Sequence, residues 1–387
     1  MNILGIYLLN QIRTGGNRRY LELMEALAER GNRVFVIINS FLDYTPRYFT
    51  VVKIPIKYIR HRFPPASYLF KKNVKKNIAS IKKELNVNNF FPIDFIQIFG
   101  DTHLKVALYL RMELRLPLFY GFRCNDIDRA HILRASGGMS LKEYLFSLLY
   151  EPINRFREKQ VARYAERISF QNSADMKRFV QRTRCPELKT VVIPGNIGLP
   201  RCTLEYENKN TSSQVKNILY VGSLSASKGL WDLLKALSIL KNKGYDFLHC
   251  RILGRLENID PTENLIKKLN IEELISIDGF KDPFPYLINS DLMVYPTLYD
   301  AFPNTVLESL HSGCPVIASE VGGVPDLLHY PELLFESGNI LQIADRIERC
   351  IKDTSFYMHI RKLCGERAAV HHFDWAEQFE NTMRACK

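Results

Sequence analysis

The sequence predicts an α/β protein made of two Rossmann-like domains whose parallel sheets face a central cleft. Strand-like apolar runs alternate with helical stripes, a glycine-bearing loop follows the first strand of each half, and a polar stretch separates the halves. The 387 residues are 46% apolar and 24% charged, as in a folded globular protein. No run reaches the ~18 apolar residues of a membrane span, and the N-terminus lacks a signal-peptide pattern. We therefore expect a cytoplasmic protein.

The first half opens with a strand, a helix and a second strand. Residues 2–9 are apolar, and Gly15 and Gly16 follow in a polar loop. Residues 17–30 carry a helical stripe that Gly31 ends. This order predicts the βαβ opening of a parallel sheet. Further strands are expected at 34–38, 51–54, 95–99, 118–120, 168–171 and 191–194, and a long amphipathic segment at 143–165 is expected to be interrupted near Pro152.

The second half repeats this pattern after a polar stretch. Residues 200–214 contain the run NKNTSS and are predicted to be a linker. We then expect strands at 217–221, 248–253, 276–278, 292–295 and 315–318, with a loop at 222–229 before the first helix. The predicted domains are 1–199 and 215–360, and the helical segment 361–387 is predicted to return to the N-terminal domain.

The segment after the strand at 292–295 carries a pattern typical of ligand binding. Asp300 lies in a loop, Asn304 is the predicted N-cap of a helix that Gly313 ends, and Glu308 lies about one turn inside. A helix start at the carboxyl end of a parallel sheet presents backbone amides to an anionic ligand. The two carboxylates can accept hydrogen bonds from sugar or ribose hydroxyls. The competing interpretation is an ordinary helix-start charge in a surface loop.

This segment resembles the acidic motif of the retaining GT-B glycosyltransferases, specifically glycosyltransferase family four, also called glycosyl transferases group one. The likeness is strong over residues 215–330, including 313–318 and 322–326, and weaker in the N-terminal half. It implies a retaining hexosyltransferase that moves a sugar from a UDP- or GDP-sugar to a glycan or lipid-linked acceptor in polysaccharide or lipopolysaccharide synthesis. It also implies a donor domain at 215–360, an acceptor-side domain at 1–199, and no metal or other cofactor.

The resemblance implies roles for individual residues. Lys228 matches the lysine that neutralises the donor diphosphate, Asp300 the acidic residue that holds donor-sugar hydroxyls, and Glu308 the carboxylate that binds the ribose. Each also has a plain structural interpretation as a surface or helix-start charge. The other expected donor contacts are the glycine loop at Gly15 and Gly16, the loop residues Gly222, Ser223, Arg255 and Phe280, and the turn formed by Phe302, Pro303, Asn304 and Thr305.

The chain departs from the family pattern in four places, one of which is Asp326 where the family commonly has Glu. Asp300 and Ala301 replace the usual Glu and Gly, and Ser223 replaces an arginine that pairs with the diphosphate. We hypothesise that Arg255 compensates for that arginine, in which case Arg255→Ala raises the donor KM. The N-terminal half also lacks the family's catalytic-site histidine after residues 118–122. The candidates for contact with the acceptor there are Arg123, Asn125, Asp126 and His103.

The net charge of +12 is unevenly distributed, at about +17 over residues 1–200 and about −5 over the rest. Near 68–83, lysines are interleaved with apolar residues, which is typical either of a helix at an anionic membrane or of a solvated basic face. We expect contact with the inner face of the cell membrane, and no nucleic acid, since no nucleic-acid motif is present. The alternatives are a sugar-nucleotide epimerase and a non-catalytic nucleotide-sugar or nucleic-acid binding protein. The lysines are Lys71, Lys72, Lys75, Lys76, Lys82 and Lys83, and the apolar residues are Tyr68, Leu69, Phe70, Ile78 and Ile81.

Overall fold

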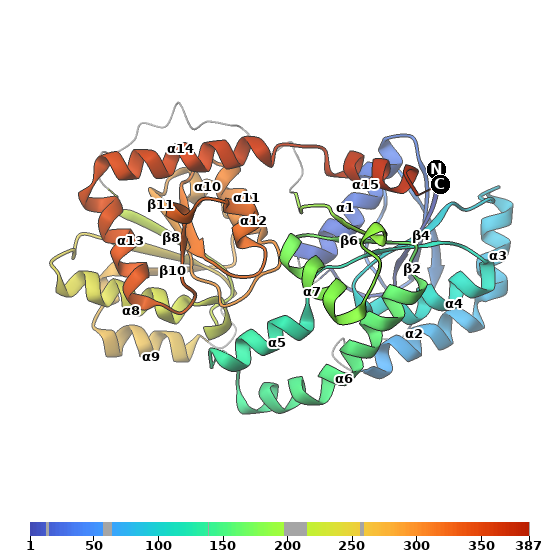
Figure 1. Ribbon diagram of the computed structural model, residues 1–387, viewed down its shortest axis with the longest axis horizontal. Helices are drawn as coiled ribbons and strands as arrows, with labels where there is room; N and C mark the ends of the chain where they lie inside the picture. The colour runs from blue at the N-terminus through green and yellow to red at the C-terminus, as the bar shows by residue number, and fades with distance from the viewer. Residues whose placement is uncertain (13–14, 57–63, 138, 197–214, 256–258, 387) are drawn as a thin grey trace. The chain divides into compact units, whose positions relative to one another are not determined.

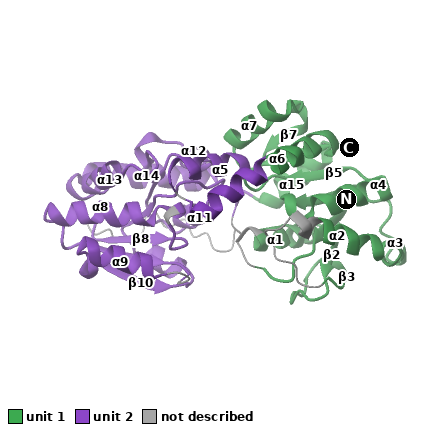
Figure 2. Cartoon of the chain, turned by 90° about the horizontal axis from the view of Figure 1, so that it is seen from below, with its two compact units in different colours: residues 1–125, 152–194, 374–387 green, residues 126–151, 195–373 purple. Residues whose placement is uncertain are grey.

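The chain folds into two compact units (Figures 1 and 2). The computed structural model describes residues 1–12, 15–56, 64–137, 139–196, 215–255 and 259–386, so the predicted linker at 200–214 lies outside the described residues. Unit 1 comprises residues 1–125, 152–194 and 374–387, and unit 2 comprises residues 126–151 and 195–373. No described helix is long and apolar enough to cross a membrane. Each unit contains a parallel sheet, which confirms the predicted pair of Rossmann-like α/β folds.

Unit 1 is built on a seven-stranded sheet in the order β3-β2-β1-β4-β5-β6-β7, in which all neighbouring strands pair in parallel. The order reverses between β1 and β4, which is the switch point where open α/β sheets bind ligands. The inner strands are almost entirely apolar and buried, as expected for strands covered on both faces. The strands are β1 (Asn2–Tyr7), β2 (Arg33–Asn39), β3 (Thr50–Ile54), β4 (Phe95–Phe99), β5 (Leu118–Gly121), β6 (Arg167–Phe170) and β7 (Thr190–Val192).

The helices of unit 1 bury apolar stripes against this sheet. Tyr20, Met24 and Leu27 of α1 enter the core, as the helical stripe predicts, and Gly31 ends the helix with a φ of 85°. Helix α15 packs on α1, and Phe379 joins the same core. The helices are α1 (Gly15–Glu29), α2 (Pro64–Lys76), α3 (Ile78–Val87), α4 (Leu104–Leu114), α7 (Ser173–Thr183) and α15 (Trp375–Arg384).

Two helices follow β5 before the chain re-enters the sheet of unit 1. Helix α5 (Asp126–Ala135) lies in unit 2, and α6 (Leu141–Tyr164) begins in unit 2 and continues into unit 1. The expected interruption near Pro152 is wrong, because α6 runs through this residue as one helix. A proline removes one helical hydrogen bond but does not always end the helix.

The lysine-rich segment of unit 1 is split between α2 and α3 by Asn77. Its apolar residues Phe70 and Ile81 are buried in the core, whereas Tyr68 and Leu69 are 59% and 37% exposed. Lys82 forms an ion pair with Glu113 at 2.6 Å. The exposed side of this segment therefore combines lysines with two apolar side chains, and contact with a membrane stays a prediction.

Unit 2 contains a six-stranded sheet in the order β10-β9-β8-β11-β12-β13, again with parallel pairings. Its strand order reverses between β8 and β11, so the loops after these two strands flank the switch point. The strands are β8 (Asn217–Val221), β9 (His249–Leu253), β10 (Ile275–Gly279), β11 (Leu292–Tyr295), β12 (Val316–Ser319) and β13 (Leu334–Phe335).

The helices of unit 2 close a second core around this sheet. Helix α8 packs against α9 and α13, and α14 packs against α11 and α13. Helix α11 starts at the switch point, and its contact with α14 holds it in place. The helices are α8 (Leu230–Asn242), α9 (Asp260–Leu269), α10 (Phe284–Ile288), α11 (Asn304–His311), α12 (Val324–Leu328), α13 (Ile340–Lys352) and α14 (Thr354–Val370).

Candidate functional site

An ion pair lies at the switch point of the sheet in unit 2. Lys228 ends a short 3₁₀ helix, η4 (Ala226–Lys228), after β8, and Asp300 lies in the loop after β11. Although 72 positions separate them, Lys228 Nζ lies 2.6 Å from Asp300 Oδ2. Because β8 and β11 are neighbouring parallel strands, their carboxyl ends meet at one edge of the sheet. The fold therefore brings together two of the residues predicted for the site.

A buried tyrosine completes this arrangement. The Tyr295 hydroxyl donates to Asp300 Oδ2 at 2.8 Å and lies 3.5 Å from Lys228 Nζ. Asp300 Oδ1 accepts from the backbone N–H of Phe302 at 3.2 Å. Both carboxylate oxygens of Asp300 are thus held by defined donors.

The charges of this cluster reinforce one another. Burial alone would lower the pKa of Lys228 and raise that of Asp300, but their mutual attraction outweighs burial. The pKa of Lys228 is therefore raised and that of Asp300 lowered. Burial, together with the charge of Asp300, raises the pKa of Tyr295. At neutral pH the cluster holds one ammonium, one carboxylate and one neutral hydroxyl that serves as a donor.

Two glycines allow the loops around the ion pair to approach each other. Gly229 has a φ of 68°, and a Cβ there would lie 1.7 Å from the carbonyl oxygen of Pro296. Gly322 has a φ of 56°, and its Cβ would lie 2.0 Å from the backbone oxygen of Asp300. Only glycine fits at such positions. The loops after β8, β11 and β12 are consequently packed backbone against backbone.

The turn that leads into α11 follows directly after Asp300. Phe302 and Pro303 are buried, whereas Asn304, Thr305 and Glu308 are partly exposed. The predicted N-cap is wrong by one residue: Pro303 occupies the cap with extended backbone, and Asn304 is the first helical residue. Proline has no side-chain acceptor, so the first amides of α11 receive no side-chain cap. These amides, one turn before Glu308, suit an anionic ligand.

The loop after β8 is rich in hydroxyl groups. The Oγ atoms of Ser223, Ser225 and Ser227 form a chain with steps of 3.0 and 3.1 Å. The hydroxyl of buried Tyr220 donates to the backbone oxygen of Ser223 at 2.8 Å. This contact fixes the loop that begins at Gly222 and ends at Lys228.

Arg255 and Phe280 follow the next two strands of the same sheet, β9 and β10. The Arg255 guanidinium lies 5.4 Å from the centre of the Phe280 ring, within cation–π distance. Both side chains are exposed. This pair lies at the carboxyl edge of the sheet, after the strands next to β8. That Arg255 compensates for the family arginine replaced by Ser223 stays a prediction.

The predicted residues of unit 1 are described separately. Gly15 and Gly16 are the first residues of α1, rather than a loop before it. Buried His103 accepts from the backbone N–H of Leu8 at 3.0 Å, so its Nε2 supports the β1 loop. Asn125 is fully buried at the end of unit 1. Their roles toward an acceptor stay predictions.

The two remaining candidates for the acceptor side are charged. Arg123 is partly exposed and donates to the side chain of Asn17 at 3.0 Å, near the start of α1. Asp126 is exposed and begins α5, in unit 2. Their roles also stay predictions.

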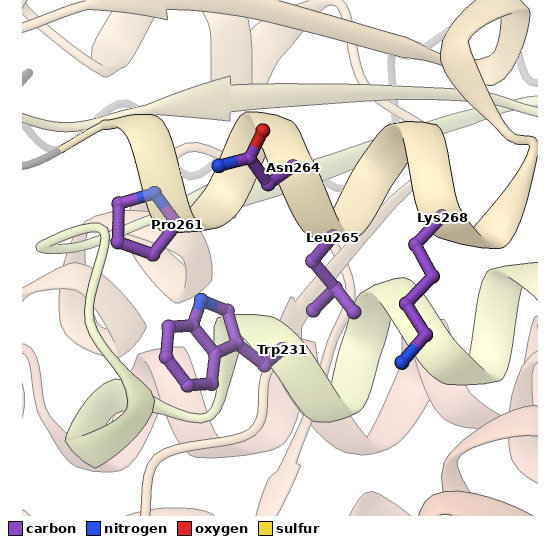
Figure 3. A pocket seen from close by; sticks show the side chains of 5 residues that line it. All are labelled: Trp231, Pro261, Asn264, Leu265 and Lys268. Carbon is purple, nitrogen blue, oxygen red and sulfur yellow. The ribbon is translucent and has the colours of Figure 1, made fainter.

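A separate pocket lies between α8 and α9 (Figure 3). None of the predicted site residues lines it, and Trp231, which does, donates to Thr262 at 3.3 Å. The described residues contain no group of three His, Cys, Asp or Glu side chains that could hold a metal ion.

Sequence reasoning missed Tyr295 and the serine chain of the β8 loop. Tyr295 ends an apolar strand, so its pattern is that of a core residue. Its only signal was the position at the carboxyl end of a strand, five residues before Asp300. The serines stood in the predicted loop, but nothing in their spacing assigned them a hydrogen-bond chain.

Residues 204–369 match the family model described as glycosyl transferases group 1. An uncharacterized glycosyltransferase of Haemophilus influenzae is 25% identical over 93% of both chains. A Campylobacter jejuni enzyme named N,N'-diacetylbacillosaminyl-diphospho-undecaprenol alpha-1,3-N-acetylgalactosaminyltransferase is 24% identical over 90% of this chain and 89% of its own. The match to a Methanocaldococcus jannaschii glycosyltransferase, at 28% identity, spans 52% of this chain and 49% of that relative.

Solved structures show the same fold along the whole chain. Sucrose-phosphate synthase of Thermosynechococcus elongatus superposes with a TM-score of 0.78 at 18% identity, covering 100% of this chain and 99% of its own. Anabaena HepE in complex with UDP-glucose has a TM-score of 0.68 at 17% identity, covering 98% and 99%.

Proposed function

The chain is a GT-B glycosyltransferase, and on that premise we propose that it transfers a hexose-type sugar from a nucleotide diphosphate sugar to a lipid-linked or glycan acceptor. The proposal is carried by one observation: a lysine and a carboxylate meet at the switch point of unit 2, beside the uncapped N-terminus of α11. A cation and backbone amides suit the diphosphate, and a carboxylate suits sugar hydroxyls.

In the proposed donor complex, Lys228 turns from Asp300 to the diphosphate. Asp300, still held by Tyr295 and the Phe302 amide, then accepts from hydroxyls of the donor sugar. Glu308 takes the ribose hydroxyls. The Lys228–Asp300 ion pair would thus be the state without donor. When the donor binds, each of the two side chains would give up its contact with the other and form a contact with the donor.

We propose a retaining reaction. The bond between the anomeric carbon and the phosphate oxygen breaks, and a bond from the acceptor oxygen forms on the same face. The acceptor proton passes to the departing phosphate. Lys228 and the amides of α11 stabilise the charge that develops on the leaving group, and fixed donors of this kind contribute strongly to catalysis. Because the chain supplies this charge, activity is expected to persist in EDTA.

The comparisons support a choice among substrates. One protein of the same fold, Anabaena HepE, has been solved with UDP and with UDP-glucose, which favours a UDP-sugar over a GDP-sugar as the donor. The Campylobacter jejuni relative, which matches nearly the whole chain, is named for a diphospho-undecaprenol acceptor. We therefore propose a lipid-linked acceptor, used in cell-surface glycan synthesis at the inner face of the membrane.

Thermal unfolding in the presence of nucleotide sugars tests the donor. UDP-glucose, UDP-galactose, UDP-N-acetylgalactosamine and GDP-mannose are compared at 1 mM, with UDP and GDP as references. Ligand at 100 times its Kd stabilises the native state by about 2.7 kcal/mol, which raises Tm by several degrees. A rise with a UDP-sugar supports the proposal, and no rise with any of these nucleotides contradicts it.

A further inference from the structure

A carboxylate lies at the switch point of the sheet in unit 1. Asp101 begins η1 (Asp101–His103), the short 3₁₀ helix that directly follows β4. The strand order reverses between β1 and β4, and open α/β sheets bind ligands at the carboxyl ends of such strands. Asp101 therefore occupies in unit 1 the kind of position that Asp300 occupies in unit 2.

The backbone on both sides of Asp101 is fixed. Gly100, which has a φ of 69°, donates its N–H to the backbone oxygen of Gly121 at 2.9 Å. At the other end of η1, the ring of His103 accepts from the backbone N–H of Leu8 at 3.0 Å. The turn is thus tied to the ends of β5 and β1, and the side chain of Asp101 starts from a defined place.

Two other elements of unit 1 orient the side chain of Asp101. The hydroxyl of Tyr120, a buried residue of β5, donates to Asp101 Oδ1 at 2.5 Å. The guanidinium of Arg157, in the part of α6 that belongs to unit 1, lies 3.7 Å from Asp101 Oδ2. In unit 2, Tyr295 donates to Asp300 in the same way, and a cation pairs with that carboxylate. Each unit thus places a carboxylate at its switch point, held by a tyrosine hydroxyl and a cation.

These contacts leave the carboxylate of Asp101 able to bind a ligand. An ionised carboxylate has about four lone-pair sites, of which Tyr120 takes one, and Arg157 lies beyond hydrogen-bond distance. The Asp101 side chain is 26% exposed, so hydroxyl groups can reach it. A partly exposed ion pair of this length contributes little to stability, so stability alone does not explain the arrangement. A negative group of this kind repels phosphate and accepts from the hydroxyls of a sugar.

We propose that Asp101, oriented by Tyr120, binds the acceptor: its carboxylate accepts hydrogen bonds from the hydroxyls of a neutral sugar unit at the end of the acceptor. This inference rests on the proposed function and narrows it. The acceptor is then a molecule that already carries a sugar, rather than a bare lipid phosphate. A reaction that attaches a first sugar must therefore precede the reaction of this protein.

The acceleration of UDP release by added acceptors tests this inference. The probes are the octyl glycosides of glucose, galactose, N-acetylglucosamine and N-acetylgalactosamine, and farnesyl phosphate represents an acceptor without a sugar. For the glycoside that accelerates the wild type most, Asp101→Asn is expected to raise the acceptor KM at least about tenfold and to leave the Kd of UDP unchanged. Glu113→Gln is the matched control, because Glu113 is also an ion-paired, partly exposed carboxylate of unit 1, and it is expected to keep the wild-type KM.

The contact between Tyr120 and Asp101 gives a second test. Tyr120→Phe keeps the buried ring, removes the hydroxyl that orients the carboxylate, and is expected to raise the same KM about threefold. If Tyr120 acts by positioning Asp101, Tyr120→Phe adds no further rise when Asp101 is already Asn. A role in packing alone would not make one effect depend on the other.

Three results would overturn the inference: an unchanged KM for Asp101→Asn, full addition of the two effects in the double variant, and wild-type UDP release that no glycoside accelerates. In the third case, acceleration by farnesyl phosphate would assign a bare lipid phosphate as the acceptor. Tm shifts with UDP are recorded for every variant, so that a folding defect is recognised. A wild type that binds no nucleotide would remove the proposed function itself, whereas the three results above are judged with UDP binding intact.

Discussion

At the scale of single residues, the contact between Lys228 and Asp300 is the feature that connects sequence and function. The motif predicted both residues as ligands for different parts of a donor, but not that they bind each other. Sequence spacing cannot reveal this contact, because it depends on β8 and β11 being neighbours in the sheet. The contact of the Tyr295 hydroxyl with Asp300 could not be predicted for the same reason, because only the fold brings the two side chains together.

This contact predicts opposite effects of one variant on binding and on turnover. Asp300→Asn removes the counter-charge of Lys228, so UDP is expected to bind about fivefold more tightly, as about 1 kcal/mol of competing ion pairing is lost. Sugar transfer is expected to fall by about 100-fold, because the carboxylate that holds the sugar is gone. Titration calorimetry with UDP and a transfer assay measure the two quantities.

The comparison variant is Tyr295→Phe, which keeps both charges and removes one hydroxyl. It is expected to leave the affinity for UDP within about twofold of the wild type and to lower transfer by less than Asp300→Asn, since the Phe302 amide still holds the carboxylate. Weaker binding of UDP by Asp300→Asn would show that Asp300 does not compete for the lysine.

At the scale of elements, the backbone approach of neighbouring loops shapes the site. Gly229→Ala puts a Cβ 1.7 Å from the Pro296 oxygen, so the loop must move. We expect the free energy of unfolding to fall by about 3 kcal/mol or more, and nucleotide binding to weaken. Gly244→Ala is the matched control, because its φ is 92° but no atom lies within 4 Å, and it should cost only about 1–2 kcal/mol. Urea unfolding distinguishes them, and equal losses would refute the role of close approach.

Elements were predicted well where the apolar periodicity and the residues that end an element agree, as in α1 with Gly31 and in the strand before Asp300. They were predicted less well where tertiary contacts decide. Pro152 looked like an end of α6, yet the helix runs through it, and the expected N-cap at Asn304 is one residue late. Ile81 stood among lysines in the sequence but is buried in the core. A periodic pattern identifies two faces of a helix, and the packing decides which of them meets solvent.

At the scale of the whole molecule, buried histidines link stability to pH. Burial, reinforced by the neighbouring His372, lowers the pKa of His311 to about 4, and burial with the nearby Arg367 lowers that of His371 to about 4. The unfolded chain, with pKa values near 6.5, takes up these protons first, so stability falls as pH drops from 6.5 toward 4. Between pH 7 and 5 the expected loss is about 2 kcal/mol for each histidine.

Urea unfolding at pH 7 and pH 5 measures this loss, and His311→Leu provides the comparison. The variant cannot take up that proton, so its stability is expected to fall less between the two pH values than that of the wild type. Equal losses in both proteins would assign the acid sensitivity to other groups.

The central claim is that Lys228 and its surroundings form the catalytic donor site of a glycosyltransferase. The most direct measurement is the release of UDP from the UDP-sugar that gives the largest thermal shift, with wild type, Lys228→Ala and Lys235→Ala. Lys235 is a partly exposed lysine of α8 that lies 3.8 Å from Asp232, and it serves as the matched control. The account predicts at least a 100-fold lower rate for Lys228→Ala and an unchanged rate for Lys235→Ala. Equal rates for Lys228→Ala and the wild type would contradict it.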